Sequence, residues 1–242
     1  MTGFSTPTAV AVNVTFEPDV FLPNVQPLES GKSVCVDSAT GKVGTGCEHN
    51  IAETVCKLYM IRESSDVPAE CTPRVAFVTS QEYTGALGGV SGADDKCQQA
   101  AVAGGLAGTF KAWISNGADR SPSTSFTRHG YFTTVTDEII AYGWNELTSG
   151  NLLQSANDNH LVPVYVDEFG NSIVWDGTRA WTNTLPSGHA ISSAALDNCG
   201  LFFFDAPHLQ GWYGSVLWSN YIWTANQMES CENTNRLYCF EQ

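Results

Sequence analysis

The first part of the chain carries the alternating pattern that is typical of short strands. Over residues 9–16, small or polar residues alternate with Val and Phe, a period of two that predicts a β-strand. Three prolines follow and disfavour a helix, namely Pro18, Pro23 and Pro27. We predict a second strand at 33–37, with its turn at 39–42, and a helix over 51–60.

The pattern changes at residue 74, where apolar β-formers become frequent. Residues 75–80 predict a buried strand, and residues 110–114 predict another. Between them, the glycine-rich stretch 85–92 predicts tight turns, with Ser91 as the cap of a helix over 93–103. After residue 119, short apolar runs alternate with stretches of Gly, Asn, Ser and Asp. This order predicts an α+β fold with an antiparallel sheet and a large share of loop.

Cysteines and prolines indicate two domains. Four cysteines precede residue 72, and a segment this short buries little core, so we expect cross-links to stabilise it. On proximity alone we expect the pairs Cys35–Cys47 and Cys56–Cys71. Pro68 and Pro73 bracket the last of these cysteines. We therefore expect a small β-rich, disulfide-stapled module or arm at 1–72 and a second domain at 73–242.

Charge narrows the range of partners. The chain of 242 residues has 25 Asp and Glu against 11 Lys and Arg, a formal net charge of −14. A nucleic-acid binder needs a basic surface, and an anionic membrane face attracts basic segments, so neither partner is expected. No apolar run reaches the roughly 18 residues that a membrane-spanning helix requires. We expect no transmembrane segment.

Cysteine spacing favours disulfides over zinc. There are 8 cysteines, none spaced C-x-x-C, and no histidine lies three to five residues from another. An even count of cysteines in an acidic, Gly-rich chain is typical of disulfides formed in an oxidising compartment. We therefore predict a secreted or cell-surface protein with no metal site.

Two adjoining segments carry a resemblance to a known family. Residues 91–100 read SGADDKCQQA and residues 104–115 read GGLAGTFKAWIS. This order resembles the G-A-D-x-x-C-x-x-A and G-L-x-G-T signature of endostatin. It also resembles a bacterial family of endostatin-like extracellular proteins of unassigned function. Further matches follow in order at 144–147 (WNEL), 174–178 (VWDGT) and 236–241 (RLYCFE).

The resemblance covers about residues 74–242 and implies a C-type-lectin-like fold. Such a fold has a compact base of strands and helices beneath a long, loop-dominated face. The resemblance also implies two disulfides, Cys97–Cys239 and Cys199–Cys231. The E-P-N and Q-P-D triplets of calcium-dependent lectins are absent from this chain. We accordingly expect no cofactor, with calcium left open.

Residues capable of catalysis do not form a recognisable set. The five histidines are scattered singly through polar stretches, at His49, His129, His160, His189 and His208. The adjacent Asp94 and Asp95 are expected to complement a helix dipole. Residues 167–171 read DEFGN, which fits half of a calcium loop or a plain hairpin turn. We expect that the protein is not an enzyme.

Aromatic residues are concentrated between Cys199 and Cys231. Exposed aromatic side chains anchor binding surfaces, because they offer a large contact area at a small entropic cost. The residues that we expect to bind a ligand on one exposed surface are Phe203, Trp212, Tyr213, Asn220, Tyr221 and Trp223. The alternative is core packing of some rings, such as Trp218 and Trp223.

These observations predict a non-enzymatic recognition or adhesion protein. Its partner would be a protein, a glycan or a second copy of the chain, bound through the 199–231 loop. One alternative is a structural subunit of a surface layer, sheath or filament, in which the strand at 9–16 joins a neighbour's sheet. Another is a variable receptor of a diversity-generating retroelement, a role that C-type-lectin-like domains serve.

Overall fold

The computed structural model describes the backbone of strand residues 34–36 and 43–45, and residues 72–117, 119–152, 163–175 and 177–242 in full. The chain divides into two compact units, Met1–His49 and Asn50–Gln242. In the first unit, β1 (Val34–Val36) pairs antiparallel with β2 (Val43–Thr45). The strand predicted at 33–37 is therefore confirmed.

Several predictions for the first part of the chain lie outside the described residues. These are the strand at 9–16, the turn at 39–42, the helix at 51–60 and the pairs Cys35–Cys47 and Cys56–Cys71. The domain boundary after residue 72 also stays a prediction.

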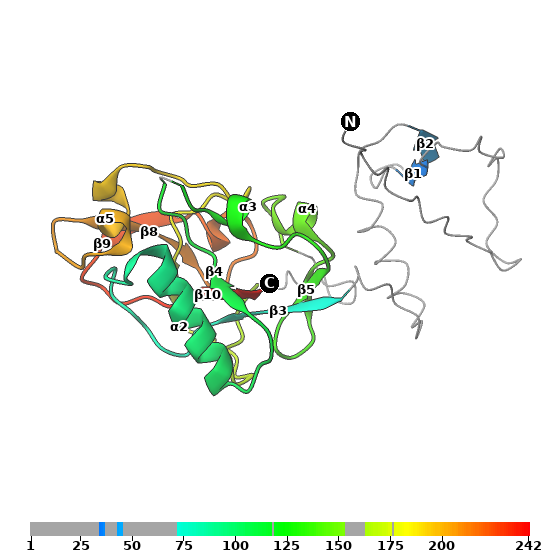
Figure 1. Cartoon of the computed structure of the whole chain (residues 1–242), viewed down its shortest axis with the longest axis horizontal. Coiled ribbons are helices and arrows are strands. Elements are labelled where there is room, and N and C mark those ends of the chain that lie inside the picture. Colours follow the sequence, from blue (N-terminus) through cyan, green and yellow to red (C-terminus); the bar gives the residue numbers. More distant parts are fainter. Residues whose placement is uncertain (1–33, 37–42, 46–71, 118, 153–162, 176) are drawn as a thin grey trace, which may run out of the picture. The chain divides into compact units, whose positions relative to one another are not determined.

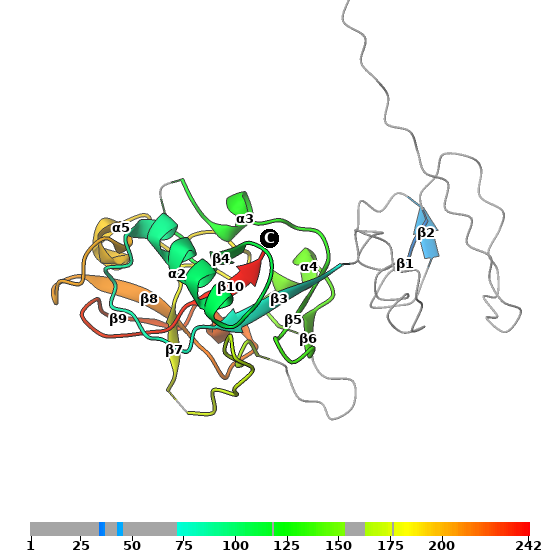
Figure 2. The ribbon, with the colours of Figure 1, turned by 60° about the horizontal axis from the view of Figure 1, so that its bottom comes forward.

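The second unit is built on a five-stranded sheet in the order β4-β10-β3-β5-β6 (Figures 1 and 2). Its strands are β3 (Pro73–Val78), β4 (Phe110–Ala112), β5 (Tyr131–Thr133), β6 (Ile139–Ala141) and β10 (Tyr238–Glu241). The strands predicted at 75–80 and 110–114 are thus present, with slightly different ends. β3 and β5 are parallel, and the other pairs are antiparallel, so the expectation of an antiparallel sheet holds except for this pair.

Helix α2 (Gly89–Ala103) lies beside this sheet and begins four residues before the predicted start (Figure 1). The N-cap is Gly88, whose φ of 86° is a left-handed conformation that glycine adopts readily. Ser91 therefore lies inside the helix, where its hydroxyl accepts a hydrogen bond from Arg120. The prediction that Ser91 caps the helix is wrong, because the helix begins earlier. A backbone group acts at its start instead: the carbonyl of Phe202 accepts a hydrogen bond from the amide of Gly88.

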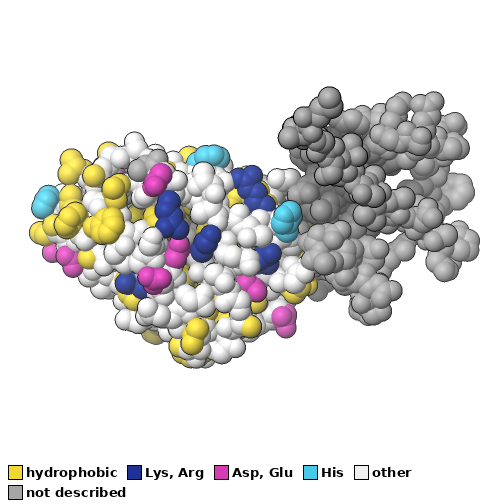
Figure 3. All heavy atoms as spheres, viewed as in Figure 1, with side chains coloured by type: hydrophobic (Ala, Val, Ile, Leu, Met, Phe, Trp, Pro, Cys, Tyr) yellow, Lys and Arg dark blue, Asp and Glu magenta, His cyan; other side chains and the backbone are white. Residues whose placement is uncertain are grey.

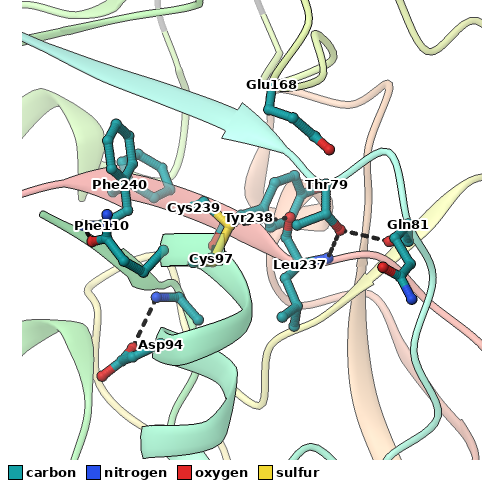
Figure 4. The surroundings of a disulfide bond; sticks show 12 residues. Thr79, Gln81, Asp94, Cys97, Phe110, Glu168, Leu237, Tyr238, Cys239 and Phe240 are labelled. Carbon is teal, nitrogen blue, oxygen red and sulfur yellow. Dashed lines mark hydrogen bonds between the residues drawn. A yellow bond between two sulfur atoms is a disulfide. The ribbon is translucent and has the colours of Figure 1, made fainter. Parts of the chain in front are cut away.

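A disulfide joins α2 to the last strand of the sheet. Cys97 on α2 is bonded to Cys239 on β10, and both residues are fully buried (Figure 4). The pairing implied by the resemblance is confirmed here. The same holds for Cys199–Cys231, which lies among the loops of the second sheet.

The second sheet has three antiparallel strands in the order β7-β8-β9. They are β7 (Arg179–Trp181), β8 (Gln210–Ser215) and β9 (Gln227–Ser230). Short helical turns punctuate the remaining loops, namely α3 (Pro122–Ser125), α4 (Trp144–Leu147), η2 (Ala195–Asp197), α5 (Cys199–Phe202) and η3 (Tyr221–Trp223). In its described residues, the second unit is therefore an α+β fold with two sheets and two disulfides. Among the described residues, no helix is long and apolar enough to cross a membrane.

Candidate recognition surface

The structure separates the aromatic residues of the 199–231 loop into two exposed groups and a buried one. Phe203 precedes β8, whereas Asn220 and Tyr221 follow it. The turn that carries Phe203 pairs with the start of β8 through Asn198 and Gly211, whereas Tyr221 lies in the connection between the other end of β8 and β9. The expectation that all six residues are exposed on one surface is wrong, because Tyr213 and Trp223 are buried.

Trp223 belongs to the core. Its side chain is 1% exposed, and its ring centroid lies 5.0 Å from that of Trp113 and 5.4 Å from that of Tyr238. The expectation that Trp223 is exposed is wrong because this ring completes an aromatic cluster beneath the sheet. The core-packing alternative is correct for Trp223, whereas Trp218 is 50% exposed.

Tyr213 is also buried, at 5% exposure. It lies on β8 opposite Trp181 of β7, and the guanidinium of Arg179 stacks 4.6 Å from its ring centroid. Arg179 also forms an ion pair with Glu229 of β9. This ion pair holds the guanidinium in place over the ring of Tyr213. The expected exposure of Tyr213 is thus wrong. Its neighbour Trp212 points to the other face of the strand and is half-buried.

Asn220 has a structural role. Its side-chain Oδ1 accepts a hydrogen bond from the amide of Ile222, which caps the short helix η3. The adjacent Tyr221 is exposed. Of the six predicted ligand-binding residues, Phe203 and Tyr221 therefore expose a large aromatic surface.

The backbone at α5 adopts a left-handed turn. Cys199, Gly200, Leu201 and Phe202 have φ values of 54°, 60°, 61° and 65°. Glycine occupies only one of these four positions, although the left-handed conformation costs other residues roughly 1–2 kcal/mol each. A conformation this unfavourable persists only where surrounding interactions hold it, and such segments are common at functional sites.

Several interactions hold the turn. Asn198 accepts a hydrogen bond from the amide of Leu201 and donates one to the carbonyl of Asn116. The carbonyl of Phe202 accepts from the amides of Leu87 and Gly88, which ties the turn to the start of α2. The disulfide from Cys199 to Cys231 adds a covalent link. The turn is thus connected to three separate parts of the fold.

This turn exposes two aromatic rings. Phe202 is fully buried, but Phe203 and Phe204 are 56% and 60% exposed, and nearby Leu196 is 65% exposed. We call these three residues, Leu196, Phe203 and Phe204, the α5 patch. Figure 3 shows apolar side chains gathered on the left, where Figure 1 places α5.

Two glycines allow the rings of the α5 patch to lie close to the backbone. A Cβ atom at Gly89 would lie 2.6 Å from the ring of Phe203, and one at Gly200 would lie 2.5 Å from the ring of Phe204. Because these positions carry no side chain, each ring rests on a glycine and exposes its other face. The rings are therefore displayed in a fixed position.

Sequence reasoning missed two members of the α5 patch. Phe204 lies in a run of three phenylalanines, and such a run cannot turn every ring to the same side of the chain. The run therefore indicates that at least one of these rings is exposed, but it does not indicate which one. No sequence signal distinguished Leu196.

The acidic residues 167–171 form a turn. Asp167 is buried, and its carboxylate accepts hydrogen bonds from the amides of Phe169 and Asn171. Glu168 is also buried and accepts from the amide and hydroxyl of Ser80. Val166 pairs antiparallel with Ser172 on either side of these residues, so the segment forms the hairpin turn. Among the described residues, no group of three His, Cys, Asp or Glu side chains is placed to hold a metal.

The described histidines lie apart on the surface. His129, His189 and His208 are exposed, and they come from separate loops. His49 and His160 lie outside the described residues.

Asp94 contacts β4 and Arg120. Because α2 begins at Gly89, Asp94 and Asp95 lie beyond its first turn, and the expected role in complementing the helix dipole is wrong. Instead, the Asp94 carboxylate accepts from the amide of Ala112 at 2.9 Å (Figure 4). It also pairs with Arg120 at 3.0 Å. Burial raises the pKa of the Asp94 carboxyl, and the two contacts oppose that rise.

We predict that Arg120→Ala raises the pKa of Asp94 further, because the substitution removes a nearby positive charge. Titration of the side-chain carboxyl by NMR measures this shift. Arg128→Ala is the matched control, since Arg128 stacks on Trp144 instead. An unchanged or lower pKa of Asp94 in Arg120→Ala would contradict this prediction.

The raised pKa of Asp94 also makes stability depend on pH. Since the folded-state pKa is raised, the contribution of Asp94 to stability is fully present below its unfolded pKa. It is lost as the pH rises through the folded value.

No protein-family model matches the chain, and a search of curated proteins finds no match.

Proposed function

We propose that this protein is a non-enzymatic recognition protein that binds a macromolecular ligand through the α5 patch. The observation that carries the proposal is the exposure of Phe203 and Phe204 on a strained turn. Folding usually buries phenylalanine, and exposed apolar groups held by an unfavourable backbone are typical of binding sites.

The fixed position of the α5 patch favours binding. A ligand that meets a flexible loop loses affinity because the loop must be ordered, whereas a preformed surface avoids that loss. The disulfide at Cys199, the cap at Asn198 and the contact of Phe202 with α2 order the turn beforehand. Aromatic rings also keep few rotatable bonds, so holding them costs little entropy.

The disulfides support an extracellular location. Cys97–Cys239 and Cys199–Cys231 are buried, and such bonds persist in oxidising compartments. Both pairs also match those that the endostatin-like resemblance implies. They support our proposal that the second unit is a C-type-lectin-like domain of a secreted or cell-surface protein.

A binding screen tests the proposed function. We expect the full chain to bind at least one member of an array of glycans and extracellular proteins, and Phe203→Ala/Phe204→Ala to lose that binding. An aromatic anchor in a desolvated contact contributes about 2 kcal/mol or more, which is roughly a thirtyfold change in affinity. Phe169→Ala is the matched control, because Phe169 is exposed by the same 56% as Phe203 but lies in the hairpin turn at 167–171.

A thermal melt of each variant separates lost binding from lost folding. If Phe203→Ala/Phe204→Ala keeps the wild-type melt and binds as the wild type does, the proposed surface is wrong. Loss of binding in Trp218→Ala/Tyr221→Ala alone would place the surface at these two residues, which follow β8 and are exposed.

A further inference from the structure

The segment that carries the α5 patch has no cation of its own, and Lys96 of the neighbouring α2 donates to the carbonyl of Leu87 and lies over the ring of Tyr83. Residues 180–235 contain no Lys or Arg. Arg179, at one boundary of this segment, pairs with Glu229 and stacks on Tyr213. Arg236, at the other boundary, donates to the carbonyls of Thr79 and Ser80. Neither guanidinium is therefore available to neutralise other carboxylates.

Three carboxylates flank the turn at α5. Asp197 directly precedes Asn198, Asp205 directly follows Phe204, and Glu232 follows Cys231, whose Cα lies 5.6 Å from that of Cys199. Within the described part of the chain, none of these three carboxylates lies in an ion pair. Asp205 and Glu232 are exposed. The exposed rings of the α5 patch are thus flanked by carboxylates that form no ion pair among the described residues.

The start of α2 does little to offset this negative charge. A helix N-terminus carries a partial positive charge, and α2 begins close to the turn. However, the carbonyl of Phe202 accepts from the amide of Gly88, and the ring of Phe203 covers Gly89. The positive end of the helix is therefore capped and shielded from a ligand at the surface.

We propose that the α5 patch binds an arginine-rich, positively charged segment of a partner protein. This proposal rests on the proposed function and names the chemistry of its ligand. Guanidinium groups stack on aromatic faces, and they also form paired hydrogen bonds with carboxylates. Phe203 and Phe204 offer the faces, and Asp205 lies next to them in the chain.

Charge argues against other occupants. A second copy of the chain would bring the same carboxylates and a net charge of −14 toward the patch, which would repel it. Nucleic acids and anionic lipids would be repelled for the same reason. A neutral glycan would stack on the rings and donate hydroxyl hydrogen bonds to Asp205, but it would gain no attraction between opposite charges.

Fluorescence anisotropy with a labelled nona-arginine peptide tests the proposal on the full chain. We expect saturable binding at about pH 8, where imidazoles are generally uncharged. Phe204→Ala should weaken it roughly tenfold through lost stacking, and Asp205→Asn should weaken it about threefold. Nona-lysine should bind more weakly than nona-arginine, because an ammonium stacks less well on a ring.

Matched controls separate this site from general attraction to an acidic protein. Asp95→Asn removes one exposed carboxylate from α2, and Phe169→Ala removes one exposed ring from the hairpin turn. Both variants should change the affinity less than about twofold. Melts of all variants establish that they are folded, and Phe204→Ala avoids disturbing the contact of Phe203 with Gly89.

Three results would overturn the proposal. One is no measurable binding of nona-arginine by the wild type. Another is an equal loss in Asp95→Asn and Asp205→Asn with no loss in Phe204→Ala, which would indicate diffuse charge attraction only. The third is binding of nona-lysine as tight as that of nona-arginine. If any of these occurs while Phe203→Ala/Phe204→Ala still abolishes binding on the array, the recognition surface stands and only the ligand chemistry is wrong.

Discussion

Trp223→Ala should lower the free energy of unfolding by about 3–5 kcal/mol, the loss typical of removing a buried large aromatic side chain. The ring is 1% exposed and contacts both Trp113 and Tyr238 at centroid distances of 5.0 and 5.4 Å. Its removal would leave a cavity among rings that are themselves buried and cannot move to fill it. Denaturant unfolding followed by tryptophan fluorescence and by circular dichroism measures the change.

Two further substitutions sharpen this prediction. Tyr221→Ala, two residues earlier, should change stability by less than about 1 kcal/mol because Tyr221 is 59% exposed. Trp223→Phe should cost less than Trp223→Ala, since it keeps a ring and removes an indole N–H that has no hydrogen-bond partner among the described residues. Equal effects of Trp223→Ala and Tyr221→Ala would show that Trp223 is not part of the core.

Removing the Cys97–Cys239 disulfide by a double substitution with alanine should cost roughly 5 kcal/mol. The bond joins residues separated by 142 positions, so its loss greatly increases the conformational freedom of the unfolded chain. The folded state should lose little, because Ala93 and Ala101 of α2 lie in the same buried cluster as Phe110 of β4, the strand next to β10. Urea unfolding of the oxidised protein measures the difference.

The second disulfide serves as the comparison. Cys199 and Cys231 are separated by 32 positions, and the same chain-entropy argument gives a loss of about 4 kcal/mol for their replacement. This bond also holds the left-handed turn, so its removal should weaken ligand binding, whereas removal of Cys97–Cys239 should not. If both double variants lose binding equally while remaining folded, the disulfide at Cys199 has no special part in positioning the α5 patch.

Local sequence patterns correctly predicted three elements whose residues have a strong propensity for the strand or helix that they form. The apolar run at 75–80, the alanine-rich stretch 93–103 and the stretch 110–114 correspond to β3, α2 and β4. The ends were less predictable, because α2 begins at Gly89, after an N-cap at Gly88 whose amide bonds to the carbonyl of Phe202, a residue distant in sequence. The two described disulfides were predicted by resemblance, since spacing alone leaves many pairings open.

Exposure in the 199–231 segment could not be predicted in the same way. Trp218 and Trp223 lie in one short stretch, WSNYIW, and no period in it assigns one ring to the surface and the other to the core. The buried place of Trp223 depends on Trp113 and Tyr238, which come from other parts of the chain. Nor does any residue type predict a left-handed turn through Leu201 and Phe202, because that conformation is imposed by contacts with Asn116 and Leu87.

Hydrogen–deuterium exchange with and without a bound ligand tests the central claim most directly. The ligand is the array member that binds most tightly, or nona-arginine. We expect protection on binding to be largest for the amides of 196–205, which include Phe203 and Phe204. Protection confined to 218–222, around Trp218 and Tyr221, or spread evenly over the chain, would contradict a recognition surface at the α5 patch.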